Sequence, residues 1–497
     1  MPLATVRRAK AAKRGSSRFI IMCNMHIFID AARNLNYVQF THLWRSPMPY
    51  AYSHSDFSPN RGMFLRVTAC CVAGFLAACS PVAYDEPMVE PVLEPAPDAA
   101  PPATEGRAAS SMIVDAPAAK IIPVEPRYKP DRRTPRRGVI TAGDIDDTLN
   151  LAAFQRYLAK AHRDTGLPAA NLSKPVLAQL TGPDGKPAPG VHITLRKPGA
   201  ADPFYSGYSG VDGNITVFPS VLGAGRLNAV ELRAFPEDQG QVFATRITTS
   251  GGRKQIALPF AGNWKPEFLD LAFVVDTTGS MGDELEWLTR ELRGIVRSAQ
   301  RVAPGASIRY GLIVYRDRGD QYVVRNFGFT NRQSQMIAWL RQQRADGGGD
   351  YPEAAAAALS AGASLNWRRG KGERLMFHIA DAPPHRRDSR AYLSAAQSAA
   401  RKGVQIFGLG ASGVASESEY LMRQAAVLTD GRYMFLTDDS GVGYGHAEPT
   451  VSCYRVTKLT DLMVRVLKSE LSGHRLEANK NAVYRTVGSY RNGVCLN

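Results

Sequence analysis

Hydrophobic and polar positions change their spacing along the chain, and the changes separate three structured segments. In residues 139–170 apolar positions recur at helical spacing, with acidic residues early and basic residues late, which predicts a helix from Asp144 to His162. In residues 171–261 short apolar runs have a period of two and are separated by Gly- and Pro-rich turns, which predicts a small antiparallel β-sandwich. In residues 262–497 continuous apolar runs alternate with helical patterns, as in an α/β, doubly wound, mostly parallel sheet.

The N-terminal residues contain a short targeting pattern. Residues 63–78 combine a basic start at Arg66 with an uncharged run that is too short to span a bilayer, so they are interpreted as a signal peptide. The run ends in Leu-Ala-Ala-Cys79 and resembles the lipobox of bacterial lipoproteins, which implies that Cys79 is lipidated. The expected location is then the bacterial cell envelope, with the lipid in the outer membrane or facing the periplasm. The alternative is a buried apolar helix with an incidental cysteine.

Two further segments flank this pattern and are not expected to fold. A signal peptide belongs at the start of a chain, so residues 1–62 are interpreted as a misassigned upstream extension; a cytoplasmic extension or a long leader is the alternative. Residues 79–138 are rich in Pro and Ala, with 12 of the 32 prolines, and poor in aromatic residues. Such a composition cannot bury enough apolar surface, which predicts a disordered tether.

The charge of the chain changes its interpretation only slightly. A formal net charge of +16 makes nucleic acid a conceivable partner. However, about half of the excess precedes Cys79, because residues 1–62 alone hold nine basic and two acidic groups. We therefore expect no nucleic-acid partner and a membrane contact through the lipid anchor. The basic residues at 127–137 could also contact anionic head groups or cell-wall polymers, and a solvated linker is the alternative.

The first candidate metal-binding residues follow the first buried strand of residues 262–497. The strand 268–275 is followed by Asp276, Thr278 and Ser280 and then by a helical pattern. Strand, loop and helix in this order place these three side chains at the carboxyl edge of a sheet, where open α/β folds bind ligands. One carboxylate beside two hydroxyls suits Mg²⁺, or Mn²⁺ or Ca²⁺. The alternative is that Asp276 only caps the helix.

Two later loops extend this pattern. A glycine loop at 346–349 leads through Asp350 into a helix, and a second buried strand, 375–380, ends in Asp381. With these loops the segment from about 268 to 471 resembles a von Willebrand factor type A (VWA) domain with a metal-ion-dependent adhesion site. In that family the first loop is Asp-x-Ser/Thr-x-Ser, a second loop supplies Thr, and an Asp follows the fourth strand. The resemblance implies one ion, with ligands at Asp276, Thr278, Ser280, Asp350 and Asp381.

Asp350 departs from the family pattern, because many members have Thr at this place. A third carboxylate lowers the positive charge that the ion retains, so it favours cation binding and weakens the binding of an acidic partner group. The alternative role for Asp350 is a helix cap. The sandwich segment resembles carboxypeptidase regulatory-like modules through Asp-Gly-Lys-Pro-x-Pro-Gly at 184–190, which implies a spacer without catalysis.

The cysteines and some shorter motifs complete the predictions. Cys453 and Cys495 are the two cysteines that follow Cys79, and an even pair in an exported chain favours a disulfide over two free thiols. Arg318-Gly-Asp320 is interpreted as a chance tripeptide. His378 lies inside an apolar strand and is interpreted as a core residue whose polar atoms are satisfied.

Together these observations predict a cell-envelope lipoprotein that binds a protein or polymer ligand through a divalent cation, with an acidic group of the ligand on the open side of the ion. The protein is not expected to be an enzyme, because no positioned base or nucleophile is evident in the loops. The alternatives are a structural envelope protein with a degenerate metal site and, less favoured, a metal-assisted hydrolase.

Overall fold

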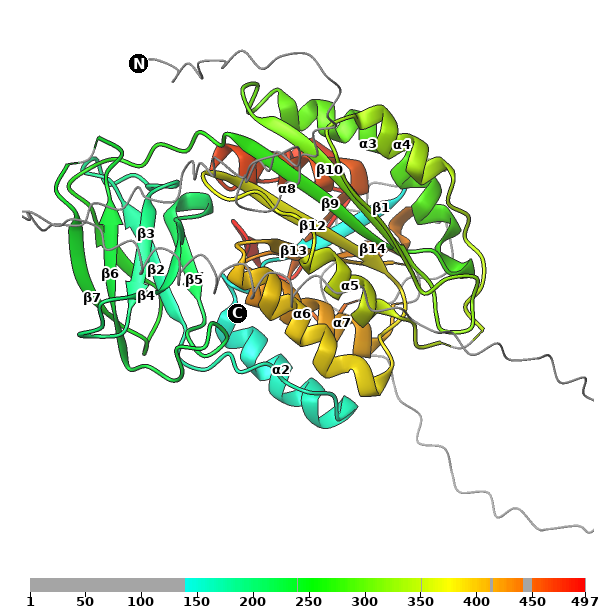
Figure 1. Ribbon diagram of the computed structural model, residues 1–497, viewed down its shortest axis with the longest axis horizontal. Coiled ribbons are helices and arrows are strands. Elements are labelled where there is room, and N and C mark those ends of the chain that lie inside the picture. Colours follow the sequence, from blue (N-terminus) through cyan, green and yellow to red (C-terminus); the bar gives the residue numbers. More distant parts are fainter. Residues whose placement is uncertain (1–138, 239, 350, 412–413, 441–448, 497) are drawn as a thin grey trace, which may run out of the picture. The chain divides into compact units, whose positions relative to one another are not determined.

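The computed structural model describes residues 139–238, 240–349, 351–411, 414–440 and 449–496 (Figure 1). The upstream extension, the signal segment with Cys79, the tether and Asp350 lie outside the described residues. None of the described helices is long and apolar enough to cross a membrane.

A nine-stranded sheet forms the centre of the larger domain, in the order β11-β10-β9-β12-β13-β14-β1-β15-β16. The neighbours from β10 to β14 are all parallel, whereas β11, β1, β15 and β16 pair antiparallel. The strands are β1 (Thr141–Ile145), β9 (Phe268–Asp276), β10 (Ser307–Tyr315), β11 (Val324–Thr330), β12 (Gly372–Ala380), β13 (Gln405–Gly410), β14 (Tyr433–Thr437), β15 (Tyr454–Lys458) and β16 (Arg485–Val487).

Helices cover both faces of this sheet, which makes it the doubly wound α/β domain that the sequence predicts (Figure 1). One apolar core joins a face of the sheet to α3 (Gly282–Gln300), α4 (Gln333–Arg341) and α8 (Leu459–Ser472). A second core joins the opposite face to α2 (Leu151–Thr165), α5 (Ala355–Ala363), α6 (Ser389–Arg401) and α7 (Ser416–Leu428). The central strand β9 is buried along its whole length, as its continuous apolar sequence requires.

The start of this domain differs from the prediction. Residues Thr141–Ile145 form β1, which lies between β14 and β15, and the helix begins only at Leu151. The expectation of a helix from Asp144 is therefore wrong at its N-terminal end, and the sheet domain does not begin at residue 262. The physical reason is that Asp144 is buried in the sheet, where Arg465 donates to it at 2.9 Å, instead of serving as an exposed acid in a first helical turn.

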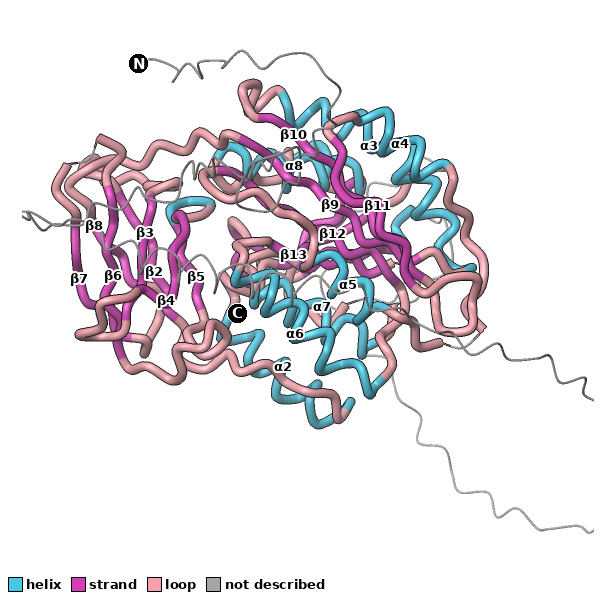
Figure 2. Tube along the Cα trace, viewed as in Figure 1, coloured by secondary structure: helices cyan, strands magenta, loops and turns pink. Residues whose placement is uncertain are grey.

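The sandwich is inserted in the chain between α2 and β9. Its two sheets have the orders β5-β2-β8 and β4-β3-β6-β7, and all neighbours except β2 and β8 are antiparallel (Figure 2). Alternate buried side chains of the strands fill the space between them. The strands are β2 (Val176–Thr181), β3 (His192–Arg196), β4 (Pro203–Tyr208), β5 (Asn214–Val217), β6 (Ala229–Phe235), β7 (Phe243–Thr248) and β8 (Lys254–Ala257).

A disulfide joins Cys453 to Cys495, with their Cα atoms 5.4 Å apart. This is the pair that the sequence predicts. It ties the C-terminal hairpin of β17 (Tyr490–Arg491) and β18 (Val494–Cys495) to the residue that precedes β15.

Candidate metal site at the carboxyl edge of the sheet

Asp276 is the last residue of β9 and is fully buried at the carboxyl edge of the sheet. Its Oδ1 accepts hydrogen bonds from the backbone N–H of Thr278 at 2.9 Å and from the Thr278 hydroxyl at 2.8 Å. Its Oδ2 has no hydrogen-bond partner within the described part of the chain. The loop thus holds the carboxylate through one oxygen and leaves the other available to a ligand.

Asp381 lies beside Asp276 because it follows β12, the parallel neighbour of β9. Its side chain is 6% exposed, the nearby Ser280 hydroxyl acts to lower its pKa, and its Oδ1 is buried with no partner among the residues described. The structure therefore brings together four of the five predicted ligands, Asp276, Thr278, Ser280 and Asp381, while the fifth, Asp350, is outside the described residues.

The electrostatics of this site favour a cation. Burial, together with the nearby charge of Asp381, raises the pKa of Asp276 to about 7. Burial also raises the pKa of Asp381. Two buried carboxylates with unsatisfied oxygens, next to two hydroxyls, are a donor set that fits a hard divalent cation such as Mg²⁺.

The donor set is nevertheless sparse. Across the described ranges, no three His, Cys, Asp or Glu side chains are placed to hold one ion together. An ion at this edge would therefore take two carboxylates and two hydroxyls from the described residues and keep waters at other positions, as Mg²⁺ usually does.

Glu353 is a residue of this edge that was not predicted as a site residue. It is 3% exposed, its Oε2 lacks a partner in the described structure, and burial raises its pKa to about 9. After burial, the causes of that rise are the negative charges of Asp276, Asp317, Asp320 and Asp381. The signal in the sequence was weak, because an acid just before an Ala-rich helix is typical of an ordinary helix start.

The glycine loop is held in place by Asp320. Its carboxylate accepts from the backbone N–H of Gly348 at 3.1 Å and of Asp317 at 3.0 Å. A Cβ on Gly347 would lie 2.5 Å from Asp320 Oδ1, and φ is +80° there, so this position requires glycine. The Arg318-Gly-Asp320 tripeptide thus has an internal role, and its arginine pairs with Asp388 at 2.8 Å.

His378 is confirmed as a core residue with satisfied polar atoms. It is 1% exposed, and its ring nitrogens lie 3.1 Å from the Tyr315 hydroxyl and 2.9 Å from the Tyr392 hydroxyl. Burial lowers its pKa to about 3, so the imidazole is neutral. Tyr315, the last residue of β10, is the register partner of Asp276 on the neighbouring strand β9.

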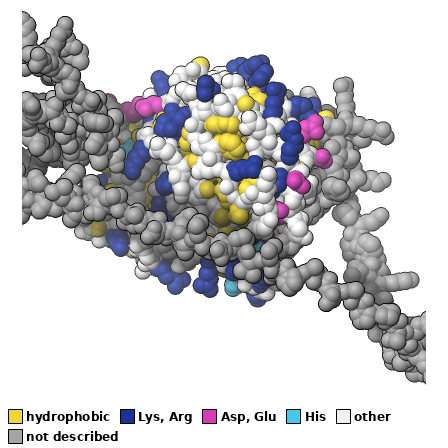
Figure 3. All heavy atoms as spheres, turned by 45° about the vertical axis from the view of Figure 1, so that its right-hand side comes forward, with side chains coloured by type: hydrophobic (Ala, Val, Ile, Leu, Met, Phe, Trp, Pro, Cys, Tyr) yellow, Lys and Arg dark blue, Asp and Glu magenta, His cyan; other side chains and the backbone are white. Residues whose placement is uncertain are grey.

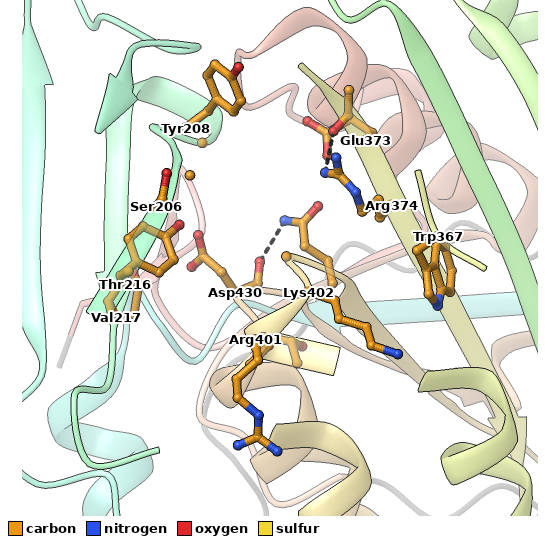
Figure 4. A pocket seen from close by; sticks show the side chains of 18 of the residues that line it. Ser206, Tyr208, Thr216, Val217, Trp367, Glu373, Arg374, Arg401, Lys402 and Asp430 are labelled. Carbon is orange, nitrogen blue, oxygen red and sulfur yellow. Dashed lines mark hydrogen bonds between the residues drawn. The ribbon is translucent and has the colours of Figure 1, made fainter. Parts of the chain in front are cut away.

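A pocket lies at the opposite, amino-terminal edge of the same sheet, where the sandwich faces β12 and β13 (Figure 4). Its volume is about 790 Å³, and its walls include Tyr208 of the sandwich and Glu373 and Asp430 of the sheet domain. Gln405 donates to the backbone oxygen of Asp430 at 3.0 Å. Burial raises the pKa of Asp430 to about 6, so this pocket also contains poorly solvated carboxylates.

The outer surface contrasts with these buried acids. On the face in Figure 3, Lys and Arg side chains outnumber Asp and Glu side chains. The acids of the candidate site are instead among the most buried residues of the domain, which separates their chemistry from the general surface charge.

Comparisons with known proteins agree with this fold. Residues 270–441 match the profile of the von Willebrand factor A domain family. An ariadne-like RING finger protein of Acanthamoeba polyphaga mimivirus is 35% identical over 121 residues, which are 24% of this chain and 12% of that protein. Alpha-protein kinase vwkA of Dictyostelium discoideum is 30% identical over 136 residues, 27% of this chain and 21% of the kinase. The chain thus spans about a fifth or less of these relatives.

Solved structures are more distant. The conserved hypothetical protein BatB from Bacteroides thetaiotaomicron is 16% identical with a TM-score of 0.27, over 34% of this chain and 89% of that one. The open conformation of the pilus adhesin SpaC from Lactobacillus rhamnosus GG is 16% identical with a TM-score of 0.29, over 49% of this chain and 31% of the adhesin chain. The family match and the sheet topology together indicate that residues 270–441 resemble a von Willebrand factor A domain.

Proposed function

We propose that the protein binds a protein or polymer ligand in a manner that depends on a divalent cation of the Mg²⁺ class. Asp276, Thr278, Ser280 and Asp381 hold the ion, Asp350 is a further donor, and an acidic group of the ligand occupies the open side of the ion. The observation that carries the proposal is the pair of buried carboxylate oxygens, on Asp276 and Asp381, that have no partner in the described residues.

The physical argument is that a divalent cation offsets the negative charges of Asp276 and Asp381. Two like charges close together at the end of a buried sheet are costly when ionised, because both side chains are buried and neither has an ion pair with a described cationic side chain. A divalent cation removes this cost and leaves coordination positions that accept oxygen donors from a partner. The VWA domain match supports a role in protein interaction.

The cellular setting follows from the sequence and is part of the proposal. Lipidated Cys79 anchors the protein in the envelope, in the outer membrane or facing the periplasm, and the tether separates the binding edge from the membrane. The absence of enzymatic activity stays a prediction.

Calorimetric titration of the chain from residue 79 onward with Mg²⁺ and with Mn²⁺ tests the ion. We expect saturable binding by the wild type and loss of it in Asp276→Asn. Asp346→Asn is the matched control, because it makes the same change of charge on the neighbouring glycine loop at a side chain that is 80% exposed. Absence of saturable binding in the wild type, or unchanged binding in Asp276→Asn, would favour a structural protein with a degenerate site.

Partner binding requires a separate test. Cross-linking on intact cells, followed by affinity isolation, is compared with and without EDTA and with the Asp276→Asn variant. Partners that depend on the cation disappear under both conditions, whereas partners retained under both would contradict the proposed role of the ion.

A further inference from the structure

Glu353 has the features of a functional carboxylate that the ligand set above does not use. Its side chain is 3% exposed and Oε2 has no partner among the described side chains and backbone. A buried carboxyl group in such a state is costly to ionise, and a bound cation would lower that cost.

The backbone places Glu353 at the candidate metal site. Its N–H donates to the Pro383 carbonyl at 2.9 Å, so it is tied to the loop that begins with Asp381. A Cβ on Gly348 would lie 2.9 Å from Glu353 Oε1 and also 2.9 Å from Thr278 Cβ. Both side chains therefore close on the same glycine, whose φ of +78° and missing side chain make this approach possible.

The charges that act most strongly on Glu353 are all negative. They come from the end of β9, from the turn between β10 and β11, and from the loop after β12, and belong to Asp276, Asp317, Asp320 and Asp381. Two of these already have hydrogen-bond partners: Asp317 lies 2.7 Å from His385 Nε2, and Asp320 accepts hydrogen bonds from the glycine loop. Asp276, Asp381 and Glu353 each retain a buried oxygen without a partner in the described chain.

We propose that Glu353 is a further carboxylate of the metal centre, which strengthens cation binding through its charge and through hydrogen bonds to waters on the ion. The inference rests on the proposed function and extends it. Glu353 acts from outside the direct ligands, in agreement with the finding that no three acidic or His side chains of the described residues are placed to coordinate one ion together. Because a third negative charge lowers the charge that the ion presents, Glu353 also weakens the capture of an acidic partner group.

Two measurements on Glu353→Gln, a variant of nearly equal shape, test this proposal. In titrations with Mn²⁺ and Mg²⁺ we expect an affinity about 10- to 100-fold lower than that of the wild type. This is the range found for residues that hydrogen-bond to metal ligands without binding the metal themselves. Asp346→Asn, the exposed control on the same loop, should change affinity by less than about threefold because its charge is screened by solvent.

Thermal unfolding separates this role from a structural one. In EDTA, Glu353→Gln should melt at the same temperature as the wild type or higher, because the amide replaces a buried carboxyl group that is costly to ionise, while the stabilisation by a fixed Mn²⁺ concentration should be smaller. A purely structural role predicts a lower melting temperature with and without the ion.

The outcomes distinguish the two proposals. If the wild type binds Mn²⁺ and Glu353→Gln binds it equally well, the role of Glu353 is refuted and the proposed function stands. If Glu353→Gln does not fold in EDTA, the carboxylate is structural and the inference is also refuted. If the wild type itself shows no saturable binding, the proposed function fails, and with it the basis of the inference.

Discussion

Asp147, two residues after β1, forms a buried ion pair with Arg423 of α7. This pair permits a quantitative test of how much the segment before the sandwich stabilises the sheet domain. Arg423 donates from Nε and Nη2 to the two carboxylate oxygens of Asp147, both at 2.8 Å, and each side chain is 4% exposed. Arg423 also donates to Glu419 at 2.9 Å and stacks on the ring of Tyr157 at 3.8 Å. Asp147→Asn removes one of two counter-charges from an arginine that has almost no access to water.

The magnitude follows from burial. Removing one partner of a buried pair costs about 3–5 kcal/mol, because the other charge is left uncompensated. Since Glu419 still contacts the guanidinium, we expect the lower end, about 3 kcal/mol of unfolding free energy. The control is Asp164→Asn on α2, whose pair with Lys160 is 54% and 71% exposed and should contribute less than about 1 kcal/mol.

Urea unfolding followed by circular dichroism measures both variants, and a cycle with Arg423→Met isolates the pair. The double variant should be more stable than the sum of the single effects predicts, because neither Asp147 nor Arg423 is then left without the other, while Glu419 loses its arginine equally in Arg423→Met and in the double variant. If Asp147→Asn destabilises the protein no more than Asp164→Asn does, the buried Asp147–Arg423 pair does not stabilise the fold and the reasoning is refuted.

Three further predictions concern other parts of the structure. A chain of residues 262–497 alone lacks β1, so β14 and β15 lose the strand between them, and we expect no cooperative unfolding and no near-ultraviolet circular dichroism of a packed core. Replacing Cys453 and Cys495 by Ser should lower the unfolding free energy by about 4 kcal/mol through loop entropy, as seen in denaturant midpoints with and without reductant. The pKa of Asp430 is raised to about 6, so between about pH 4 and 6 the folded state keeps a proton that the unfolded state loses, and the free energy of unfolding falls as pH rises. Asp430→Asn should remove up to about 3 kcal/mol of this pH-dependent decrease, as measured by unfolding curves across this range.

Sequence patterns were sufficient where burial is uniform along an element. The apolar run ending at Asp276 could only be a central strand, and a strand followed by a polar loop and a helix sets where Thr278 and Ser280 lie. The alternating runs of 171–261 likewise required a sheet with one buried face. In both cases local hydrophobicity and tertiary position agree.

The pattern failed where a polar residue is buried by distant partners. Asp144 is a strand residue because Arg465, more than 300 positions away, neutralises it, and no local pattern contains that information. Glu353 poses the same difficulty, since its significance depends on loops after β9, β10 and β12 that meet only in the folded sheet. Charges at a sheet edge therefore have to be interpreted from topology before their chemistry can be assigned.

The edge of the sheet couples ion binding to stability. Asp276, Asp381 and Glu353 are each at most 6% exposed, and each has an oxygen without a described partner, so without an ion they must be protonated or ionised at a cost. Any cation that relieves this cost binds the folded state and not the unfolded chain, and it stabilises the fold by an amount that grows with its concentration. Because the relief depends on all three loops being in place, an ion at this edge would order the surface that a partner meets. Cation dependence of partner binding can thus arise from loop order as well as from direct coordination of the partner.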